Sequence, residues 1–161
     1  MIIILMGVSG SGKTTIGELL SEALVWKFYD ADDFHPPANV EKMSRGVALN
    51  DDDRSIWLDR LSNLIGEIIG RGESAVLACS ALKQAYRQQL AGGREEARFV
   101  YLKGDYELLK RRLGDRRGHY FNPDLLASQF DTLEEPEGAI TVEVDDDPDT
   151  IVANIRRALG L

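Results

Sequence analysis

The sequence predicts an α/β fold in which a parallel sheet carries helices on both faces. Three observations predict it. Short apolar runs alternate with amphipathic stretches along the chain, five of those runs have the length of buried strands, and helical patterns separate them. The 161 residues contain no repeat, low-complexity tract or linker that would divide them. We therefore expect one three-layer domain that spans residues 1–161.

The elements are assigned from apolar runs for strands and from apolar side chains three and four residues apart for helices. The clearest helix follows Asn50 and three aspartates, which suit the positive end of a helix dipole. Prolines in the first turn favour the short helix over 36–46 and the last helix, which opens at Pro148 behind Asp147. In chain order, we expect strands over 2–6, 27–30, 74–79, 99–102 and 139–144, and helices over about 13–24, 36–46, 54–70, 82–90, 105–113 and 125–132 and from 148.

Composition and charge restrict the classes of function. Apolar residues make up 43% and charged residues 29%, as in ordinary folded proteins. The formal net charge of −8 argues against broad binding to nucleic acid or to an anionic membrane. No apolar run approaches the roughly 20 residues that cross a bilayer, and no targeting segment is evident. The single cysteine, Cys79, cannot form an internal disulfide, so we expect a cytoplasmic protein.

Residues 7–14 fit the phosphate-binding pattern G-x-x-x-x-G-K-[ST], with a predicted strand before it and a predicted helix after it. The glycines allow successive backbone N–H groups to point at a phosphate, and the helix N-terminus adds partial positive charge. Lys13 is expected to reach the β- and γ-phosphates, and the hydroxyl of Thr14 to bind Mg²⁺. The predicted ATP-binding residues of this loop are Gly7, Val8, Ser9, Gly10, Ser11, Gly12, Lys13 and Thr14.

Other motifs narrow the kind of nucleotide-binding protein. The guanine-reading N/T-K-x-D pattern is absent. The third predicted strand ends in Cys79 and the fourth runs into Lys103, so neither supplies the acid that motor-type ATPases place there. A small phosphotransferase is therefore the better fit.

Acids and arginines near the expected strand ends are candidates for the chemistry. Asp30 and Asp32 follow the second strand, at the end of the sheet where α/β proteins bind ligands, and they share a side if the extended backbone continues. A carboxylate can orient an acceptor hydroxyl and accept its proton, and carboxylates also bind Mg²⁺. Arg112 and Arg116 lie in or beside a glycine-containing segment that we expect to form a lid over about 114–123.

Several blocks outside the phosphate loop carry a family resemblance. Residues 30–43 read DADDFHPPANVEKM, and residues 49–54 read LNDDDR with Trp57 after them. Residues 79–83 read CSALK, followed by Tyr86 and Arg87, and similar blocks continue to Pro136. Together these residues resemble the gluconate kinases of bacteria and eukaryotes over nearly the whole chain. The resemblance leaves a homodimer open.

The resemblance implies that the protein uses ATP and Mg²⁺ to phosphorylate D-gluconate to 6-phospho-D-gluconate. It also implies a P-loop fold like that of nucleoside monophosphate kinases, with sheet order 2-3-1-4-5 and a lid. By similarity to the related shikimate kinases, Asp30 is expected near Mg²⁺ and Asp32 near the acceptor hydroxyl. The implied catalytic residues are Lys13, Asp32 and Arg116; those around gluconate are Asp32, His35, Arg54, Lys83, Tyr86, Arg87, His119 and Gln129; and those around ATP beyond the loop are Arg112, Arg116, Asp147 and Pro148.

Two other functions remain open from the sequence. One is a kinase for another small hydroxy acid, such as shikimate. The other is a nucleotide-binding module without turnover, which the intact Lys13, Thr14 and Asp32 argue against.

Overall fold

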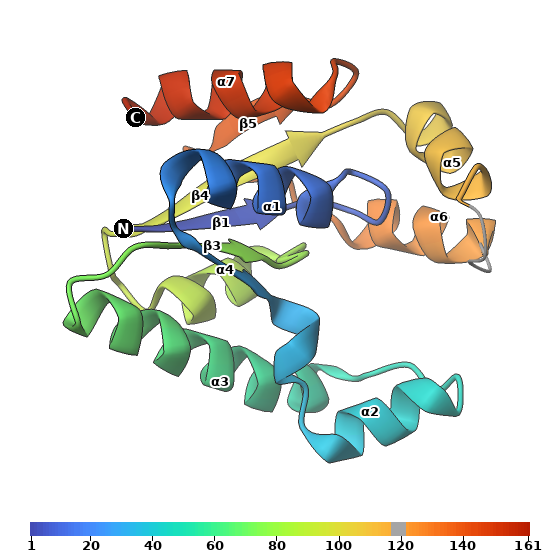
Figure 1. Ribbon diagram of the computed structural model, residues 1–161. Helices are drawn as coiled ribbons and strands as arrows, with labels where there is room; N and C mark the ends of the chain where they lie inside the picture. Colours follow the sequence, from blue (N-terminus) through green and yellow to red (C-terminus); the bar gives the residue numbers. More distant parts are fainter. Residues whose placement is uncertain (117–121) are drawn as a thin grey trace.

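A five-stranded parallel sheet forms the centre of the computed structural model, which describes residues 1–116 and 122–161 (Figure 1). Its order is β2-β3-β1-β4-β5, which confirms the order implied by the family resemblance. The first strand, β1, pairs in parallel with β3 on one side and β4 on the other. The strands are β1 (Ile2–Met6), β2 (Lys27–Asp30), β3 (Ala75–Ala78), β4 (Ala97–Lys103) and β5 (Ile140–Glu143).

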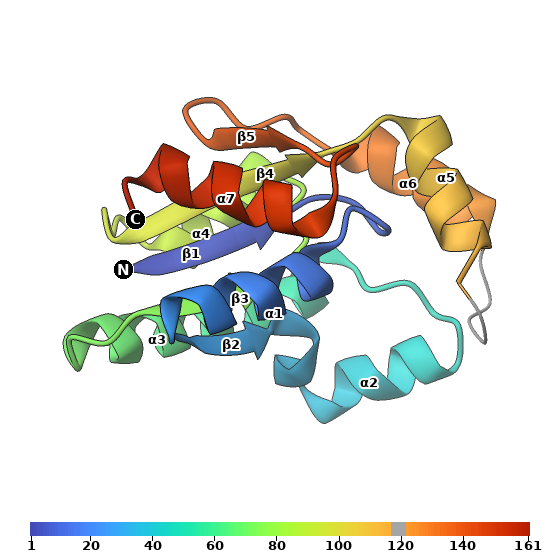
Figure 2. The same cartoon turned by 45° about the horizontal axis from the view of Figure 1, so that its top comes forward.

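Helices cover both faces of this sheet, as expected. On one face lie α1 (Lys13–Leu24) and α7 (Pro148–Leu159), and on the other lie α3 (Asp51–Gly70) and α4 (Gln84–Ala91) (Figure 1). The remaining helices lie beyond the C-terminal ends of the strands, with α2 (Pro37–Ser44) on one side and α5 (Tyr106–Gly114) and α6 (Pro123–Thr132) on the other (Figure 2). Ligand-binding residues of an open parallel sheet are expected at this end.

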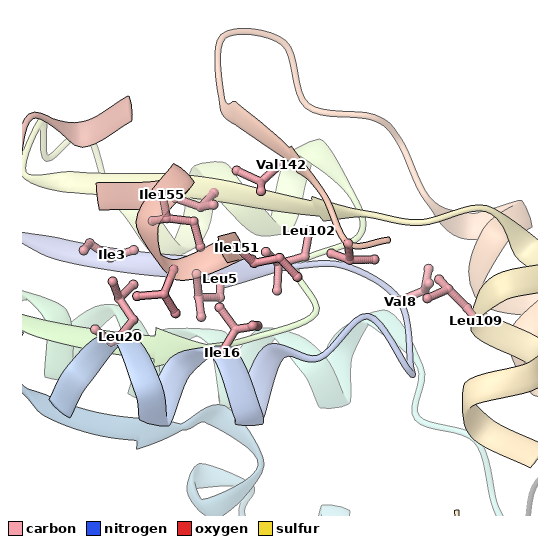
Figure 3. Close-up of a cluster of buried hydrophobic side chains, with 14 of the residues drawn as sticks. Ile3, Leu5, Val8, Ile16, Leu20, Leu102, Leu109, Val142, Ile151 and Ile155 are labelled. Carbon is pink, nitrogen blue, oxygen red and sulfur yellow. The ribbon is translucent and has the colours of Figure 1, made fainter. Parts of the chain in front are cut away.

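Strand β1 is buried on both of its faces. Ile3 and Leu5 belong to the cluster under α1 and α7, where they meet Ile16, Leu20 and Ile155 (Figure 3). Their neighbours Ile2, Ile4 and Met6 belong to the cluster under α3 and α4. Because successive side chains of a strand point to opposite faces, a strand covered on both faces has to be apolar at every position.

Two local structures differ from the sequence-based expectation. The backbone does not stay extended past Asp30 but forms a 3₁₀ turn, η1, over Ala31–Phe34, so strand alternation does not place Asp30 and Asp32. The carboxylate of Asp30 accepts the backbone N–H of Asp32 at 2.9 Å and caps this turn. Helix α4 begins at Gln84, later than predicted, because Lys83 has an extended backbone with φ −97° and ψ 146°.

Helix α3 begins at Asp51, three residues before the predicted start at residue 54, and Asn50 caps it. The side chain of Asn50 accepts the N–H of Asp53 at 2.8 Å, and the carboxylate of Asp53 accepts the N–H of Asn50 at 3.1 Å. Such a reciprocal capping box satisfies two otherwise unpaired backbone donors and fixes where the helix begins. In the described parts of the chain, no helix has the length and apolar character needed to cross a bilayer.

Candidate active site

The loop between β1 and α1 has the backbone of a phosphate cradle. A Cβ on Gly7 would lie 2.9 Å from the carbonyl oxygen of Leu102, and one on Gly10 would lie 2.9 Å from Cγ of Leu113. Both contacts are too short, and Gly10 also has a positive φ of 81°. Only glycine therefore fits at these two positions, where the loop passes close to β4 and α5.

The side chain of Lys13 folds back over this loop. Its ammonium donates to the carbonyl oxygens of Gly7 at 3.0 Å and Val8 at 3.1 Å. Burial lowers the pKa of Lys13 to about 8, although the nearby charges of Asp30 and Asp32 oppose that shift. The ammonium thus lies against the loop where an incoming phosphate would replace two weak carbonyl partners by a charged one.

Thr14 and Asp30 bring two oxygen ligands together beside the loop. The hydroxyl of Thr14 lies 3.5 Å from Oδ2 of Asp30, while Oδ1 of Asp30 is taken by the cap of η1. Magnesium is usually bound by one or two protein oxygens together with waters and phosphate oxygens. This donor set therefore fits Mg²⁺, and Thr14 with Asp30 would hold it.

A cavity of about 250 Å³ opens between the phosphate loop and the ends of β2 and β3. Asp32 lines it with a side chain that is 84% exposed, so its carboxylate is open to an acceptor hydroxyl. The cavity is lined by Ser9, Gly10, Gly12, Lys13, Thr14, Asp30, Asp32, Ala78, Cys79, Ser80, Arg116 and Gln129.

A second cavity, of about 310 Å³, lies on the other side of the phosphate loop toward α7. Arg112 and Pro148 line it, and Arg112 also donates to the carbonyl oxygen of Val144. Arg116 lines both cavities, so this residue lies between the two places where ligands could be held. This position fits contact with a phosphoryl group in transfer.

Asp147, predicted around ATP, is a helix cap in the structure. Its carboxylate caps α7 by accepting the N–H of Thr150 at 3.1 Å and the hydroxyl of Thr150 at 2.6 Å. It does not line the second cavity, where Asp146 lies instead. Sequence spacing could not distinguish these neighbours, because both follow β5 in a run of aspartates.

Gln129 joins α6 to the phosphate loop. Its side chain accepts the N–H of Ser9 at 2.7 Å and donates to the hydroxyl of Ser9 at 3.0 Å. Gln129 lines the first cavity, and its side-chain amide is hydrogen-bonded to the phosphate loop. Cys79 lines the same cavity and is buried, and burial raises the pKa of its thiol to about 12, which disfavours the nucleophilic thiolate.

Three predicted substrate-binding residues meet at one carboxylate that sequence reasoning missed. Oδ1 of Asp51 accepts the hydroxyl of Tyr86 at 2.8 Å and lies 3.5 Å from Nζ of Lys83 and 3.9 Å from Arg54. The Tyr86 hydrogen bond, and then Lys83, holds the pKa of Asp51 below its usual range. The sequence did not single out Asp51, because the aspartate run after Asn50 predicts only a helix cap.

Arg87, predicted around gluconate, is held by backbone carbonyl oxygens in the structure. Arg87 is only 4% exposed. Its guanidinium donates to the carbonyl oxygens of Ala81 at 2.8 Å, Leu82 at 3.1 Å and Glu134 at 2.8 Å, and also to the side chain of Gln84. Its donors hold the loop after β3 and the segment after α6, so the residue is a structural anchor.

His35 lies near Asp32, with its Nε2 3.9 Å from Oδ1 of that carboxylate. Burial lowers the pKa of His35 below its usual range. His119 and the centre of the predicted lid lie outside the described residues.

Comparison with known proteins gives the family. Residues 9–149 match the model of the shikimate kinase family. A protein from Xenopus tropicalis named probable gluconokinase is 47% identical over 96% of this chain and 91% of its own length. The thermosensitive gluconokinase of Escherichia coli K12 is 40% identical over 97% of this chain and 86% of its own. The crystal structure of a gluconokinase from Sinorhizobium meliloti, 40% identical, superposes with a TM-score of 0.85 over 98% of this chain and 90% of that one. The chain therefore belongs to the shikimate kinase family and, within it, to the gluconokinases.

Proposed function

We propose that this protein transfers the γ-phosphoryl group of ATP to D-gluconate and forms 6-phospho-D-gluconate and ADP. One observation carries the proposal: residues of the phosphate loop and of three further blocks of the family resemblance lie at one end of the sheet. The phosphate loop supplies Lys13, η1 supplies Asp32, and the α3 and α4 regions supply Arg54 and Lys83 around Asp51. Relatives at 40–47% identity bear the name gluconokinase.

The reaction needs an activated hydroxyl and a stabilised phosphoryl group. The acceptor oxygen attacks the γ-phosphorus in line, the bond to the bridging oxygen of ADP breaks, and Asp32 accepts the hydroxyl proton. Lys13 and Arg116 face the charge that spreads over the transferring oxygens. Mg²⁺, when held by Thr14 and Asp30, neutralises phosphate charge.

The opposite end of gluconate carries a carboxylate, which suits the cationic group at α3 and α4. Arg54 can bind a carboxylate through two parallel hydrogen bonds, and Lys83 and Tyr86 add a charge and a hydroxyl. In the structure these three side chains surround Asp51. We infer that the substrate carboxylate competes with Asp51 for them, while Arg112 and Pro148 lie on the side of the nucleotide. The proposal includes the cytoplasmic location that the sequence predicts.

A panel of acceptors in an assay of ADP formation tests the proposal. Gluconate should give ADP formation that requires both the acceptor and Mg²⁺, while shikimate and no acceptor give background rates. Turnover with shikimate but not with gluconate would show that shikimate, and not gluconate, is the acceptor. ATP binding without acceptor-dependent ADP formation would refute the kinase proposal and indicate a nucleotide-binding module without turnover.

A further inference from the structure

The ring of His35 is held rigidly beside the candidate acceptor site. It stacks on Trp57 with ring centroids 4.3 Å apart and planes 14° apart. Trp57 is fixed in turn, because its indole N–H donates to the carbonyl oxygen of Ala31 at 2.7 Å. The side chain of His35 is only 6% exposed. The ring therefore presents its nitrogens in fixed directions.

Asn39 determines which ring nitrogen carries the proton. Its amide nitrogen lies 3.0 Å from the backbone carbonyl oxygen of Asp53 and 3.4 Å from Nδ1 of His35. A carbonyl oxygen only accepts, so the NH₂ group of Asn39, and not its oxygen, must face Asp53. The second hydrogen of that NH₂ group then points at Nδ1 of His35. Nδ1 must accept, and in the neutral ring the proton lies on Nε2.

The protonated nitrogen faces Asp32. Nε2 of His35 lies 3.9 Å from Oδ1 of Asp32, and the Asp32 side chain is 84% exposed. The distance is longer than a hydrogen bond, but rotation of the exposed carboxylate toward the fixed ring can close it. An exposed carboxylate has many orientations in water, and a fixed N–H donor on one side favours the few that meet it.

We propose that Asn39 holds His35 as the Nε2–H tautomer, and that His35 acts as a positioning residue which orients Asp32 toward the acceptor hydroxyl. His35 then does not contact gluconate, unlike the role that the family resemblance implied. This inference rests on the proposed function only in assigning the acceptor hydroxyl to Asp32.

The arrangement also keeps the ring neutral. A second proton would have to sit on Nδ1, where it would meet the N–H of Asn39 head-on. Burial and the nearby charge of Arg54 lower the pKa of His35, although the charge of Asp32 opposes this shift. His35 therefore offers a hydrogen bond without adding a positive charge to the acceptor site.

The tautomer can be read directly and without any activity. The chain has two histidines, so a His119→Gln variant labelled with ¹⁵N leaves the ring signals of His35 alone. Long-range ¹H–¹⁵N spectra at pH 7 should show a protonated Nε2 and an unprotonated Nδ1. A proton on Nδ1, or on both nitrogens, would overturn the inference.

The positioning role is tested by three variants measured with ATP and gluconate. His35→Phe keeps a ring on Trp57 but removes the donor, and kcat should fall by about tenfold to a hundredfold, as for small misplacements of reacting groups, while KM for gluconate changes little. His35→Gln can place an amide N–H near the position of Nε2 and should recover part of kcat. Asn39→Asp offers only acceptors, so it should move the ring proton to Nδ1 and lower kcat.

Lys42→Met is the matched control. Lys42 joins α2 to α3 through an ion pair with Asp53 at 2.8 Å, close to the Asn39 contact, but it does not touch His35. This variant should keep both kcat and the tautomer. The inference is wrong if His35→Phe leaves kcat unchanged or raises only KM, or if Lys42→Met lowers kcat as much as Asn39→Asp does. If the wild-type protein instead phosphorylates another acceptor, the gluconate proposal fails, and the same variants measured on that acceptor still decide the role of His35.

Discussion

Replacing Arg87 by methionine separates a structural anchor from a substrate contact. Methionine keeps an apolar stem but removes the donors that Arg87 gives to the carbonyl oxygens of Ala81, Leu82 and Glu134. Hydrogen bonds from charged groups contribute about 1.5–3 kcal/mol each, and relief from burying the guanidinium offsets part of their loss. A net destabilisation of about 3 kcal/mol follows for the variant.

Urea unfolding followed by tryptophan fluorescence measures this loss. With a slope of about 2 kcal/mol per molar urea, the unfolding midpoint of Arg87→Met should fall by about 1.5 M. KM for gluconate should change little at a temperature where the variant is folded. Arg54→Met is the control, because the Arg54 side chain is 36% exposed and its loss should leave the midpoint unchanged while raising KM. An unchanged midpoint together with a raised KM in Arg87→Met would refute the structural role.

Three further substitutions test single residues of the site. Lys13→Ala should abolish transfer without lowering the unfolding midpoint, and near-normal turnover would contradict its phosphate role. Asp32→Asn should lower kcat by on the order of a hundredfold or more, because the amide cannot accept the hydroxyl proton. An effect on ATP affinity alone would indicate that Asp32 binds Mg²⁺ instead. Asp147→Ala should lower the unfolding midpoint and leave ATP affinity unchanged, since Asp147 caps α7. Because Thr150 holds the pKa of Asp147 below its usual range, the stabilisation is complete well above about pH 4 and disappears as the pH falls through the folded-state pKa. The midpoints of wild type and variant should therefore converge in acid, and a constant difference would contradict the capping role.

The sequence predicted the layers and the phosphate loop because both are local patterns. The apolar run of β1 and the spacing over α1 gave the observed bounds, Ile2–Met6 and Lys13–Leu24. The loop motif is contiguous, so its residues could be placed together without any tertiary information. The turn η1 was missed because Asp30 reads equally well as the last residue of a strand and as the cap of a turn.

The acceptor side was harder to predict because its contacts join distant segments. Arg87 looked like another cation near the site, but its partners are backbone carbonyls, which no side-chain pattern reveals. Asp51 accepts a hydrogen bond from Tyr86, 35 positions away in the sequence. The aspartate run around it predicts only a helix cap. The orientation of the Asn39 amide is set by the carbonyl oxygen of Asp53, 14 positions further on, so the sequence pattern does not reveal it.

The central claim is transfer of phosphate from ATP to gluconate, and identifying the phosphorylated product tests it most directly. Purified protein with ATP, Mg²⁺ and gluconate can be followed by ³¹P NMR under single-turnover conditions. We predict one ADP for each phosphomonoester formed, with coupling that assigns the phosphate to the C6 oxygen, and no product from Lys13→Ala. Release of ADP with inorganic phosphate alone, or no ADP in the presence of gluconate, would contradict the claim.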